Sequence, residues 1–403
     1  MKILIYGINY SPELTGIGKY SGEMGAWLAS RGHEVRAVTA PPYYPDWEIQ
    51  TPYKNRYATE QLDGVRVVRC PLYVPESVST SKRILHLASF ALSSLPRLLA
   101  QTFWKPDVVI CVVPSMFCVP VSWLLARLAG AKHVVHVQDF EVDAMLGLNM
   151  SGKGIVSKAA RWFEHVCLRC ADILSTISNS MVNRAIAKGV ASSRTLLFPN
   201  WAEVDRFLNV SETARSELRD RLGLSADKKL CLYSGNIGEK QGLENVLLAA
   251  DAMRNESVEF LLVGQGAGLG FLKQRAKELD LPNVRFLPLQ PWEDLPALLG
   301  LADCHLVIQR KGVADAVLPS KLTNILAVGG QALITAEQGT ELANLCAEYS
   351  GIAELVEPED MGQLIAAIKV VIAKQGFNEI AQEYARNNLD KESVLRAFEL
   401  ALQ

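Results

Sequence analysis

The chain has 403 residues, more than one hydrophobic core usually serves, so two domains are expected. Its 41 basic and 43 acidic residues give a net charge of −2, which excludes the global basic signature of a nucleic-acid-binding protein. The eight scattered cysteines, several inside apolar runs, are typical of reduced, buried thiols in a cytosolic protein.

The chain begins with a strand, a loop, a helix and a second strand, predicted at residues 2–6, 7–18, 19–31 and 33–40. Such units build parallel sheets that bind ligands beyond the carboxyl ends of the strands. Gly16 and Gly18 place glycine where backbone must turn sharply or approach a ligand. The spacing does not match the dinucleotide fingerprint, which argues against a hydride-transfer cofactor. No signal-peptide layout and no membrane-spanning run is seen, so a cytoplasmic location is expected.

Prolines and three aromatic residues follow the second strand. Tyr43, Tyr44 and Trp47 lie at its carboxyl end and are our candidates for stacking against an acceptor sugar. The alternative is an ordered surface loop without a ligand.

The segment 81–105 is basic and amphipathic. It carries four cations and no acid, and Ile84, Leu87, Ala91, Leu95 and Leu98 recur near helical spacing. Such a helix can lie on an anionic membrane. Alternatively it packs its apolar stripe on the sheet, with Pro96 as a break in the helix.

Further strands are predicted at residues 107–113, 132–138, 172–176 and 195–198. Asp139 follows the second of these strands at its carboxyl end, where catalytic groups collect. Asp139, Glu141 and Asp143 alternate on one short stretch, and such residues rarely converge on one ion, so we expect no metal. His136, inside the strand, is interpreted as a core histidine.

A second series of strands and helices follows a crossing at residues 199–206. Strands are predicted at residues 229–234, 258–263, 284–287, 304–309 and 332–335. The first of them ends in a glycine-bounded loop with Asn236 and Lys240, and the second ends at Gly264.

A late helix is the strongest candidate for an anion site. Pro319 has the fixed φ that suits a helix start, and Ser320 and Lys321 form the first turn. Free backbone N–H groups, the helix dipole and a lysine all favour a phosphate at this end. Many helix starts bind nothing, so the pattern alone leaves both outcomes open.

Three motifs together resemble the family 4 retaining glycosyltransferases of GT-B fold. They are Tyr10-Ser-Pro with Gly16-Ile-Gly18 and the run 28–35, the loop 234–242, and the segment 318–329. The resemblance implies an α/β protein with two doubly wound Rossmann-like domains facing across a cleft. We expect an acceptor domain at residues 1–200, a nucleotide-sugar domain at 201–388, and a final helix at 389–403 that crosses back to the first domain.

The resemblance also implies the roles of individual residues. Donor-binding positions are Gly16, Gly18, Asn236, Lys240, Gly264, Ser320, Lys321 and Asn324, and acceptor positions are Tyr43, Tyr44 and Trp47. Asp139 and Gln138 are the catalytic candidates, with Gln138 near the position of the family's histidine. The family's two glutamates fall on Ala316 and Asn324, and Asn324 can still bond a ribose hydroxyl through its amide.

The reaction that the resemblance implies is retaining transfer of a sugar, with fucose as the first candidate, from a nucleotide sugar. The most similar members serve exopolysaccharide biosynthesis of the colanic-acid type. We expect a GDP-sugar rather than a UDP-sugar and no further cofactor. The expected acceptor is an oligosaccharide on a polyprenyl diphosphate, reached by peripheral attachment to the inner face of the cytoplasmic membrane.

Two alternatives come from other classes. A sugar-nucleotide epimerase would also bind such a ligand on a paired α/β scaffold. A non-catalytic subunit of a polysaccharide assembly complex is suggested by the missing glutamates.

Overall fold

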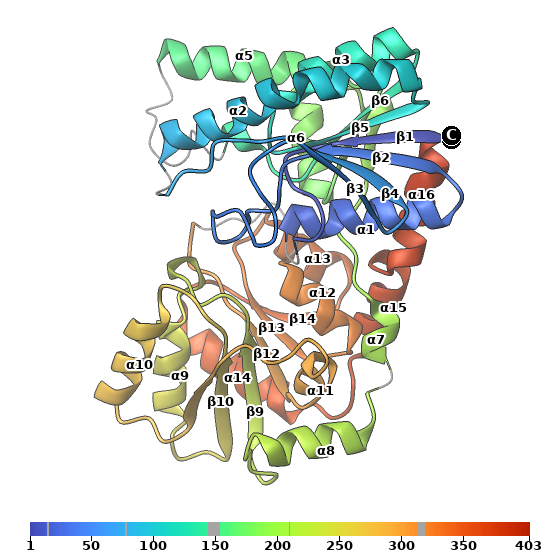
Figure 1. Ribbon diagram of the computed structural model, residues 1–403. Coiled ribbons are helices and arrows are strands. Elements are labelled where there is room, and N and C mark those ends of the chain that lie inside the picture. Colours follow the sequence, from blue (N-terminus) through green and yellow to red (C-terminus); the bar gives the residue numbers. More distant parts are fainter. Residues whose placement is uncertain (14–15, 77–78, 144–153, 209, 313–318) are drawn as a thin grey trace. The chain divides into compact units, whose positions relative to one another are not determined.

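The computed structural model describes residues 1–13, 16–76, 79–143, 154–208, 210–312 and 319–403. They form two compact units, each built around its own sheet (Figure 1). The N-terminal unit comprises Met1–Phe198 and Leu395–Gln403, and the C-terminal unit comprises Pro199–Val394. The predicted α/β class with two Rossmann-like halves is confirmed.

The N-terminal unit contains an eight-stranded sheet of order β3-β4-β2-β1-β5-β6-β7-β8. All neighbours are parallel except the hairpin of β3 and β4, which sequence analysis did not find. The central strands are apolar throughout because helices cover both faces, and β5 is buried at every position. The strands are β1 (Lys2–Tyr6), β2 (Glu34–Thr39), β3 (Ala58–Leu62), β4 (Val65–Arg69), β5 (Val108–Val113), β6 (Lys132–Val137), β7 (Ile173–Thr176) and β8 (Thr195–Leu197).

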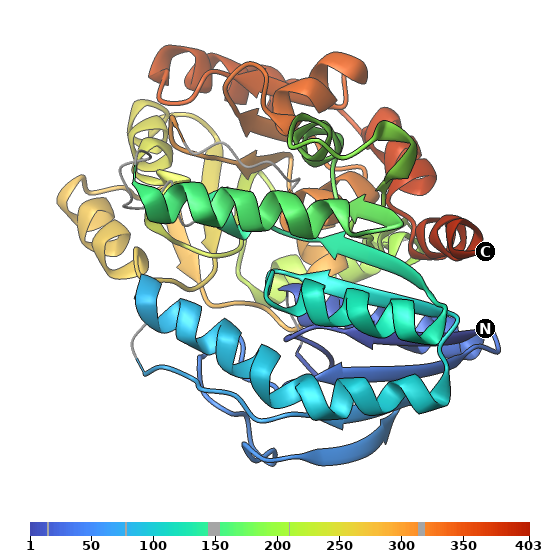
Figure 2. The ribbon, with the colours of Figure 1, turned by 90° about the horizontal axis from the view of Figure 1, so that it is seen from above.

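The helices of this unit lie on both faces of the sheet, with α2, α3 and α5 on one face (Figures 1 and 2). They are α1 (Gly16–Ser30), α2 (Thr80–Leu99), α3 (Cys118–Ala129), α5 (Ile155–Arg169) and α6 (Asn179–Ala187), with 3₁₀ turns η1 (Ala100–Trp104) and η2 (Ser192–Arg194). The predicted break at Pro96 is wrong, because α2 continues through it to Leu99. Proline removes the donor to the carbonyl of Leu92, and Leu92 is exposed, so water can replace the lost bond.

The last helix, α16 (Lys391–Leu402), places its carboxyl-terminal residues in the N-terminal unit. The ring of Phe398 stacks on that of Phe198, with centroids 3.8 Å apart. Glu399 Oε1 lies 2.7 Å from His33 Nε2, and Lys132 Nζ donates to the carbonyl oxygen of Leu402 at 2.8 Å. These contacts hold the chain end against the first sheet.

The C-terminal unit contains a six-stranded parallel sheet of order β11-β10-β9-β12-β13-β14. This is the doubly wound order, and its winding reverses between β9 and β12, where such sheets bind ligands beyond the carboxyl ends. The strands are β9 (Lys229–Ser234), β10 (Val258–Val263), β11 (Val284–Leu287), β12 (Cys304–Val307), β13 (Ala332–Thr335) and β14 (Ala353–Val356). The last of these was not predicted.

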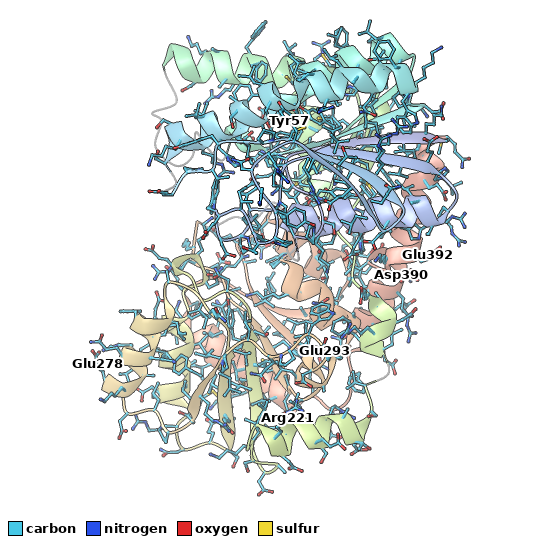
Figure 3. The ribbon with its side chains drawn as sticks, viewed as in Figure 1. Tyr57, Arg221, Glu278, Glu293, Asp390 and Glu392 are labelled. Atoms are coloured by element: carbon cyan, nitrogen blue, oxygen red, sulfur yellow. The ribbon has the colours of Figure 1, made fainter. Side chains whose placement is uncertain are left out.

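Two apolar clusters fill the two faces of this sheet, and alternate residues of β9 enter different clusters. The helices α9, α10 and α14 cover one face, and α7, α8, α11, α12, α13 and α15 cover the other. They are α7 (Val204–Leu208), α8 (Glu212–Arg221), α9 (Glu244–Ala252), α10 (Leu269–Glu278), α11 (Leu295–Gly300), α12 (Ser320–Ala327), α13 (Glu341–Glu348), α14 (Met361–Ala373) and α15 (Glu379–Asn388), with the 3₁₀ turn η3 (Glu239–Gln241). Charged side chains such as Arg221 and Glu278 cover their outer faces (Figure 3).

Candidate active site

The start of α12 lies at the carboxyl edge of the C-terminal sheet. Pro319 has a φ of −59° and Ser320 is the first helical residue, as the sequence predicted. Lys321 Nζ lies 4.2 Å from the ring centroid of Tyr233, next to the last residue of β9. The Tyr233 hydroxyl donates to the carbonyl oxygen of Asn236 at 2.5 Å. The lysine therefore lies beside the point where the winding of the sheet reverses.

The loops after β9 and β10 touch each other at glycines. A Cβ on Gly264 would lie 1.9 Å from the carbonyl oxygen of Gly235. Gly266 has a φ of +150°, and a Cβ there would lie 2.2 Å from the carbonyl oxygen of Ile237. Gly264 and Asn236 thus lie on adjoining loops, and Gly264 is required first of all by this close backbone packing.

Lys240 and Arg310 lie on neighbouring segments of the same edge. The backbone N–H of Arg310 donates to the carbonyl oxygen of Lys240 at 3.0 Å. The guanidinium group of Arg310 forms an ion pair with Glu244 of α9. Sequence analysis missed Arg310, although its place just after the strand at the winding reversal was a usable signal.

Asn324 lies three residues after Lys321 on α12 and is half-buried. The first turn of α12 contains no acid, so its amino-terminal positive charge is not offset within that turn. Ala316, at the position of the family's other glutamate, lies outside the described residues.

In the N-terminal unit, the buried carboxylate of Glu13 organises the glycine loop. Its Oε1 accepts from the backbone N–H groups of Tyr43 and Tyr44, both at 3.2 Å, and its Oε2 accepts from Asn9 Nδ2 at 3.0 Å. A Cβ on Gly18 would lie 2.2 Å from Glu13 Oε2, so glycine leaves room for this carboxylate. Desolvation raises the pKa of Glu13 above its usual value. The loop after β1 and the aromatic loop are therefore joined.

The three aromatic candidates differ in exposure. Tyr43 is buried, with its ring centroid 4.8 Å from that of His86 and 5.7 Å from that of Trp47. Tyr44 is 39% exposed, and its ring lies near Gly16, whose φ is +63°. Only Tyr44 and the half-buried Trp47 present ring surface, so the acceptor prediction rests on these two residues.

Arg69 connects the loop after β1 with the aromatic loop after β2. The sequence analysis did not identify it. Its side chain is 1% exposed, and its guanidinium donates to the carbonyl oxygens of Ala40 at 3.0 Å and Ser11 at 2.6 Å. Its Nε forms a 2.7 Å ion pair with Glu60 of β3. A single arginine in a strand pattern gave no indication of this role.

Gln138 is buried and forms a hydrogen bond with His136 of β6. Its Nε2 lies 3.0 Å from His136 Nε2, and His136 Nδ1 lies 2.9 Å from the hydroxyl of Ser175. Burial lowers the pKa of His136 to about 3, so this histidine is neutral and part of the core, as predicted.

The three acids after β6 have three different environments. Asp139 is exposed at the strand's carboxyl end. Glu141 is buried, and desolvation raises its pKa to about 7. Asp143 forms ion pairs with Lys188 at 2.9 Å and Arg184 at 3.1 Å. Asp139 is therefore the most exposed of the three.

Comparison with known families identifies the class of protein. Residues 15–201 match the glycosyl transferase 4-like domain, and residues 214–388 match glycosyl transferases group 1. With its two Rossmann-like units, the chain belongs to the family 4 glycosyltransferases of GT-B fold, and it is a glycosyltransferase.

Relatives make the assignment more specific. Over 402 residues the chain is 56% identical to the Escherichia coli (strain K12) protein named "Putative colanic acid biosynthesis glycosyl transferase WcaI", covering 99% of this chain and 98% of that one. Sucrose-phosphate synthase from Thermosynechococcus elongatus has the same fold, with a TM-score of 0.74 at 16% identity over 99% and 98% of the two chains. Anabaena HepE, solved in complex with UDP, has a TM-score of 0.71 at 16% identity over 100% and 99%.

Membership of this family favours sugar transfer over the two alternative functions considered from the sequence, a sugar-nucleotide epimerase and a non-catalytic assembly subunit. In the described part of the chain, no helix is long and apolar enough to cross a membrane.

Proposed function

We propose that this glycosyltransferase moves a sugar, with retention, from a nucleotide sugar to an oligosaccharide on a polyprenyl diphosphate, in biosynthesis of a colanic-acid-like exopolysaccharide. The observation that carries the proposal is the cationic start of α12 at the carboxyl edge of β9. The full-length relative named for colanic acid biosynthesis supports the pathway, and fucose from a GDP-linked donor is our first candidate substrate. The complex of Anabaena HepE with UDP makes UDP-sugars the alternative donors.

Donor binding would use charge at the edge of the C-terminal sheet. The diphosphate would meet Lys321 and the amino-terminal turn of α12, and Lys240 on the loop after β9 is the second candidate cation. As the bond from the anomeric carbon to the diphosphate oxygen breaks, negative charge accumulates on the leaving group. Fixed positive charge there stabilises the transition state without a divalent ion.

The acceptor side of the proposal concerns Asp139 and the aromatic loop. A bond forms between an acceptor hydroxyl oxygen and the anomeric carbon, and the hydroxyl proton must be taken up. An exposed carboxylate at the end of β6 is suited to orient that hydroxyl or receive its proton. Tyr44 and Trp47 would stack on acceptor sugars.

Donor binding is tested by calorimetry with GDP and UDP. Lys321→Ala should weaken nucleoside diphosphate binding by about tenfold or more, because a charge-assisted contact is lost. Lys273→Ala, an exposed lysine of α10 in the same unit, is the matched control and should bind like the wild type.

Transfer is tested by supplying labelled GDP-fucose and UDP-glucose with a polyprenyl-diphosphate-linked oligosaccharide acceptor. The proposal expects label in the lipid-linked product and none without the acceptor. Epimerised donor in the absence of acceptor, or equal nucleotide binding by wild type and Lys321→Ala, would contradict it.

We also propose that α2, α3 and α5 dock the protein on an anionic membrane. Of the predicted apolar stripe of α2, Leu87, Ala91 and Leu98 are buried against the unit, which supports the packing interpretation for these residues. Other apolar side chains of the three helices and η1 are exposed. They include Leu92 at 72%, Phe103 at 93%, Leu128 at 62% and Trp162 at 68%.

The charged residues of these helices are almost all basic. Their sequences contain a single acid, Glu164, and its side chain is buried. Exposed cations such as Lys158 and Arg161 flank Trp162 on α5. Each cation near an anionic surface contributes about 1 kcal/mol, so attachment should be reversible and sensitive to salt. Docking would hold the enzyme where a lipid-linked acceptor is confined.

Liposome flotation tests this docking. Lys158→Glu with Arg161→Glu should lose binding to anionic vesicles while keeping the thermal midpoint. Lys273→Glu with Lys277→Glu on α10 makes the same charge change in the other unit and should retain binding. Equal flotation of both double variants would remove α5 from the docking surface.

A further inference from the structure

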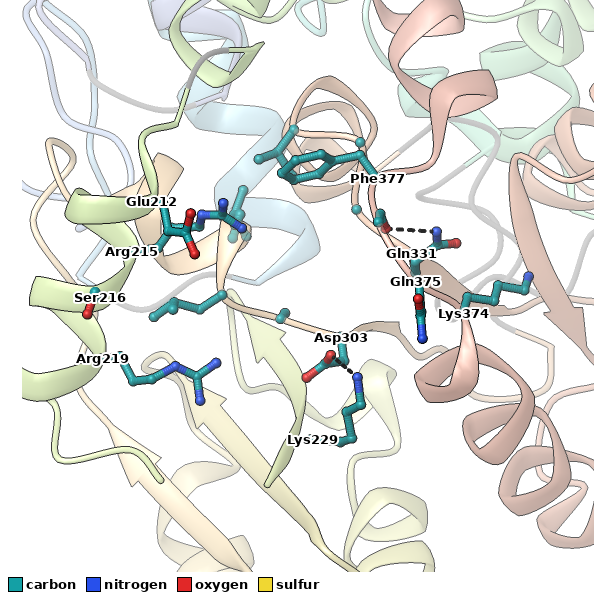
Figure 4. Close-up of a pocket in the computed structure, with 18 residues that line it drawn as sticks. Glu212, Arg215, Ser216, Arg219, Lys229, Asp303, Gln331, Lys374, Gln375 and Phe377 are labelled. Carbon is teal, nitrogen blue, oxygen red and sulfur yellow. Dashed lines mark hydrogen bonds and ion pairs between the residues drawn. The ribbon is translucent and has the colours of Figure 1, made fainter. Parts of the chain in front are cut away.

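The C-terminal unit has a polar cavity at the edge of its sheet opposite to Lys321. Its volume is about 540 Å³, within the range of small-molecule sites. Lys229 is the first residue of β9, and Asp303 and Gln331 immediately precede β12 and β13. These lining residues therefore place the cavity at the amino ends of the strands, away from the proposed donor site (Figure 4).

The cavity lining carries more positive than negative charge. Arg215 and Arg219 extend into it from α8, and Lys229 and Lys374 line it (Figure 4). Lys229 Nζ is neutralised by Asp303 at 2.8 Å. Among the described residues, neither arginine forms an ion pair with a carboxylate.

Arg215 is the least satisfied of these groups. Its Nε is buried and has no hydrogen-bond partner among the described residues. Its guanidinium lies over the ring of Phe377, 5.5 Å from the centroid, and its stem packs on Gly300, where a Cβ would be 3.0 Å from Arg215 Cδ. In the part of the chain that the structure describes, Arg219 Nη1 donates to the carbonyl oxygen of Ser225, at 2.7 Å. Glu212 of α8 also lines the cavity, but among the described residues it forms no ion pair with either arginine. A planar cation held on an aromatic ring, without a paired acid, is suited to receive phosphate oxygens.

We propose that this cavity binds a small phosphorylated metabolite of the size of a sugar phosphate. The phosphate would lie between Arg215 and Arg219, and the organic part would lie toward Phe377. The volume exceeds that of a bare anion, and the mixture of arginines, glycine backbone and one aromatic ring matches a polar organic phosphate.

A single helix connects this cavity with the proposed donor site. α12 begins with Ser320 and Lys321 at the carboxyl edge, and Val328, Gly329 and Gly330, just beyond its end, line the cavity. Its eight residues span about 12 Å. The backbone N–H of Asn378, next to Phe377, donates to the carbonyl oxygen of Gly329 at 2.7 Å. A ligand that contacts this end of α12 is therefore expected to change the nucleotide affinity at its other end, so the cavity is assigned a regulatory role.

Binding of the metabolite does not depend on the proposed glycosyl transfer, and its test has no activity readout. Calorimetry with glucose 1-phosphate, and with inorganic phosphate alone, is carried out in the presence and absence of saturating GDP. The wild type should bind glucose 1-phosphate in both conditions, and Lys321→Ala should bind it equally well. The double variant Arg215→Gln and Arg219→Gln should bind at least about tenfold more weakly.

Two further variants keep the result interpretable. Arg254→Gln removes an exposed arginine of the same unit, paired with Asp251, and should leave binding unchanged. Arg215→Lys preserves charge but not the planar fork, and should weaken binding while keeping the wild-type thermal midpoint.

No binding of glucose 1-phosphate, or binding lost in Lys321→Ala and unaffected in the double variant, would overturn the site. GDP affinity measured with and without glucose 1-phosphate should differ at least about twofold. Equal GDP affinities would overturn the regulatory role.

Discussion

Glu141 makes the stability of the N-terminal unit depend on pH. Its side chain is 3% exposed, and its Oε2 accepts one long hydrogen bond, 3.5 Å from the backbone N–H of Met116. Its Oε1 is buried and has no partner in the part of the chain that the structure describes. Desolvation is the largest cause that raises its pKa, and the negative charges of Asp139 and Glu164 add to it, while Arg83 opposes it.

The cost of ionising this group follows from its pKa. A carboxyl whose pKa rises from 4.5 to about 7 on folding binds more protons in the folded than in the unfolded state between these values. The contribution of Glu141 to stability is therefore greatest at low pH and is lost as the pH rises through about 7. Between pH about 5 and about 8.5 the loss amounts to about 2 to 3 kcal/mol.

Glu141→Gln removes the ionisation and keeps the shape. Thermal midpoints of the wild type and Glu141→Gln should be similar near pH 5, and the variant should become the more stable of the two at pH 8.5. Glu48→Gln, at an exposed position of the same unit, controls for the loss of one carboxylate. A difference between wild type and Glu141→Gln that stays constant over this range would refute the reasoning.

Three other substitutions test the site. Gly264→Ala should destabilise the C-terminal unit by about 1 to 3 kcal/mol, because its Cβ meets the carbonyl oxygen of Gly235, whereas Gly270→Ala, with open space around its Cβ, should be tolerated in the same thermal melt. Arg69→Met should cost about 2 to 4 kcal/mol by denaturant titration, since it leaves the carbonyl oxygens of Ala40 and Ser11 and the part-exposed carboxylate of Glu60 without a donor; a loss below about 1 kcal/mol would refute this. Asp139→Asn should reduce kcat at least about 100-fold and leave the calorimetric Kd for GDP unchanged, and equal turnover would assign Asp139 a structural role.

Apolar runs and helix-start chemistry were enough to predict much of the fold. The buried strand β5 and the start of α12 after Pro319 are local patterns, because apolar continuity and a fixed φ act within a few residues. Alternating strands and helices predict a parallel sheet with right-handed connections, but more than one doubly wound order fits that pattern, so tertiary structure decided the order seen in the second sheet. The sequence by itself therefore determined two Rossmann-like units and the end of α12 that bears Lys321.

Tertiary structure decided which of the candidate side chains are available. Tyr43 and Tyr44 are identical and adjacent in sequence, yet only packing against His86 buries the first and leaves the second exposed. Arg69 connects two loops only because β4 pairs with β2, which places its guanidinium group beside the carbonyl oxygen of Ala40. The cavity around Arg215 joins α8 to the loop before α15, more than a hundred residues later in the chain. Contacts of this kind depend on how distant elements pack, and the local propensities from which a sequence is interpreted do not contain that information.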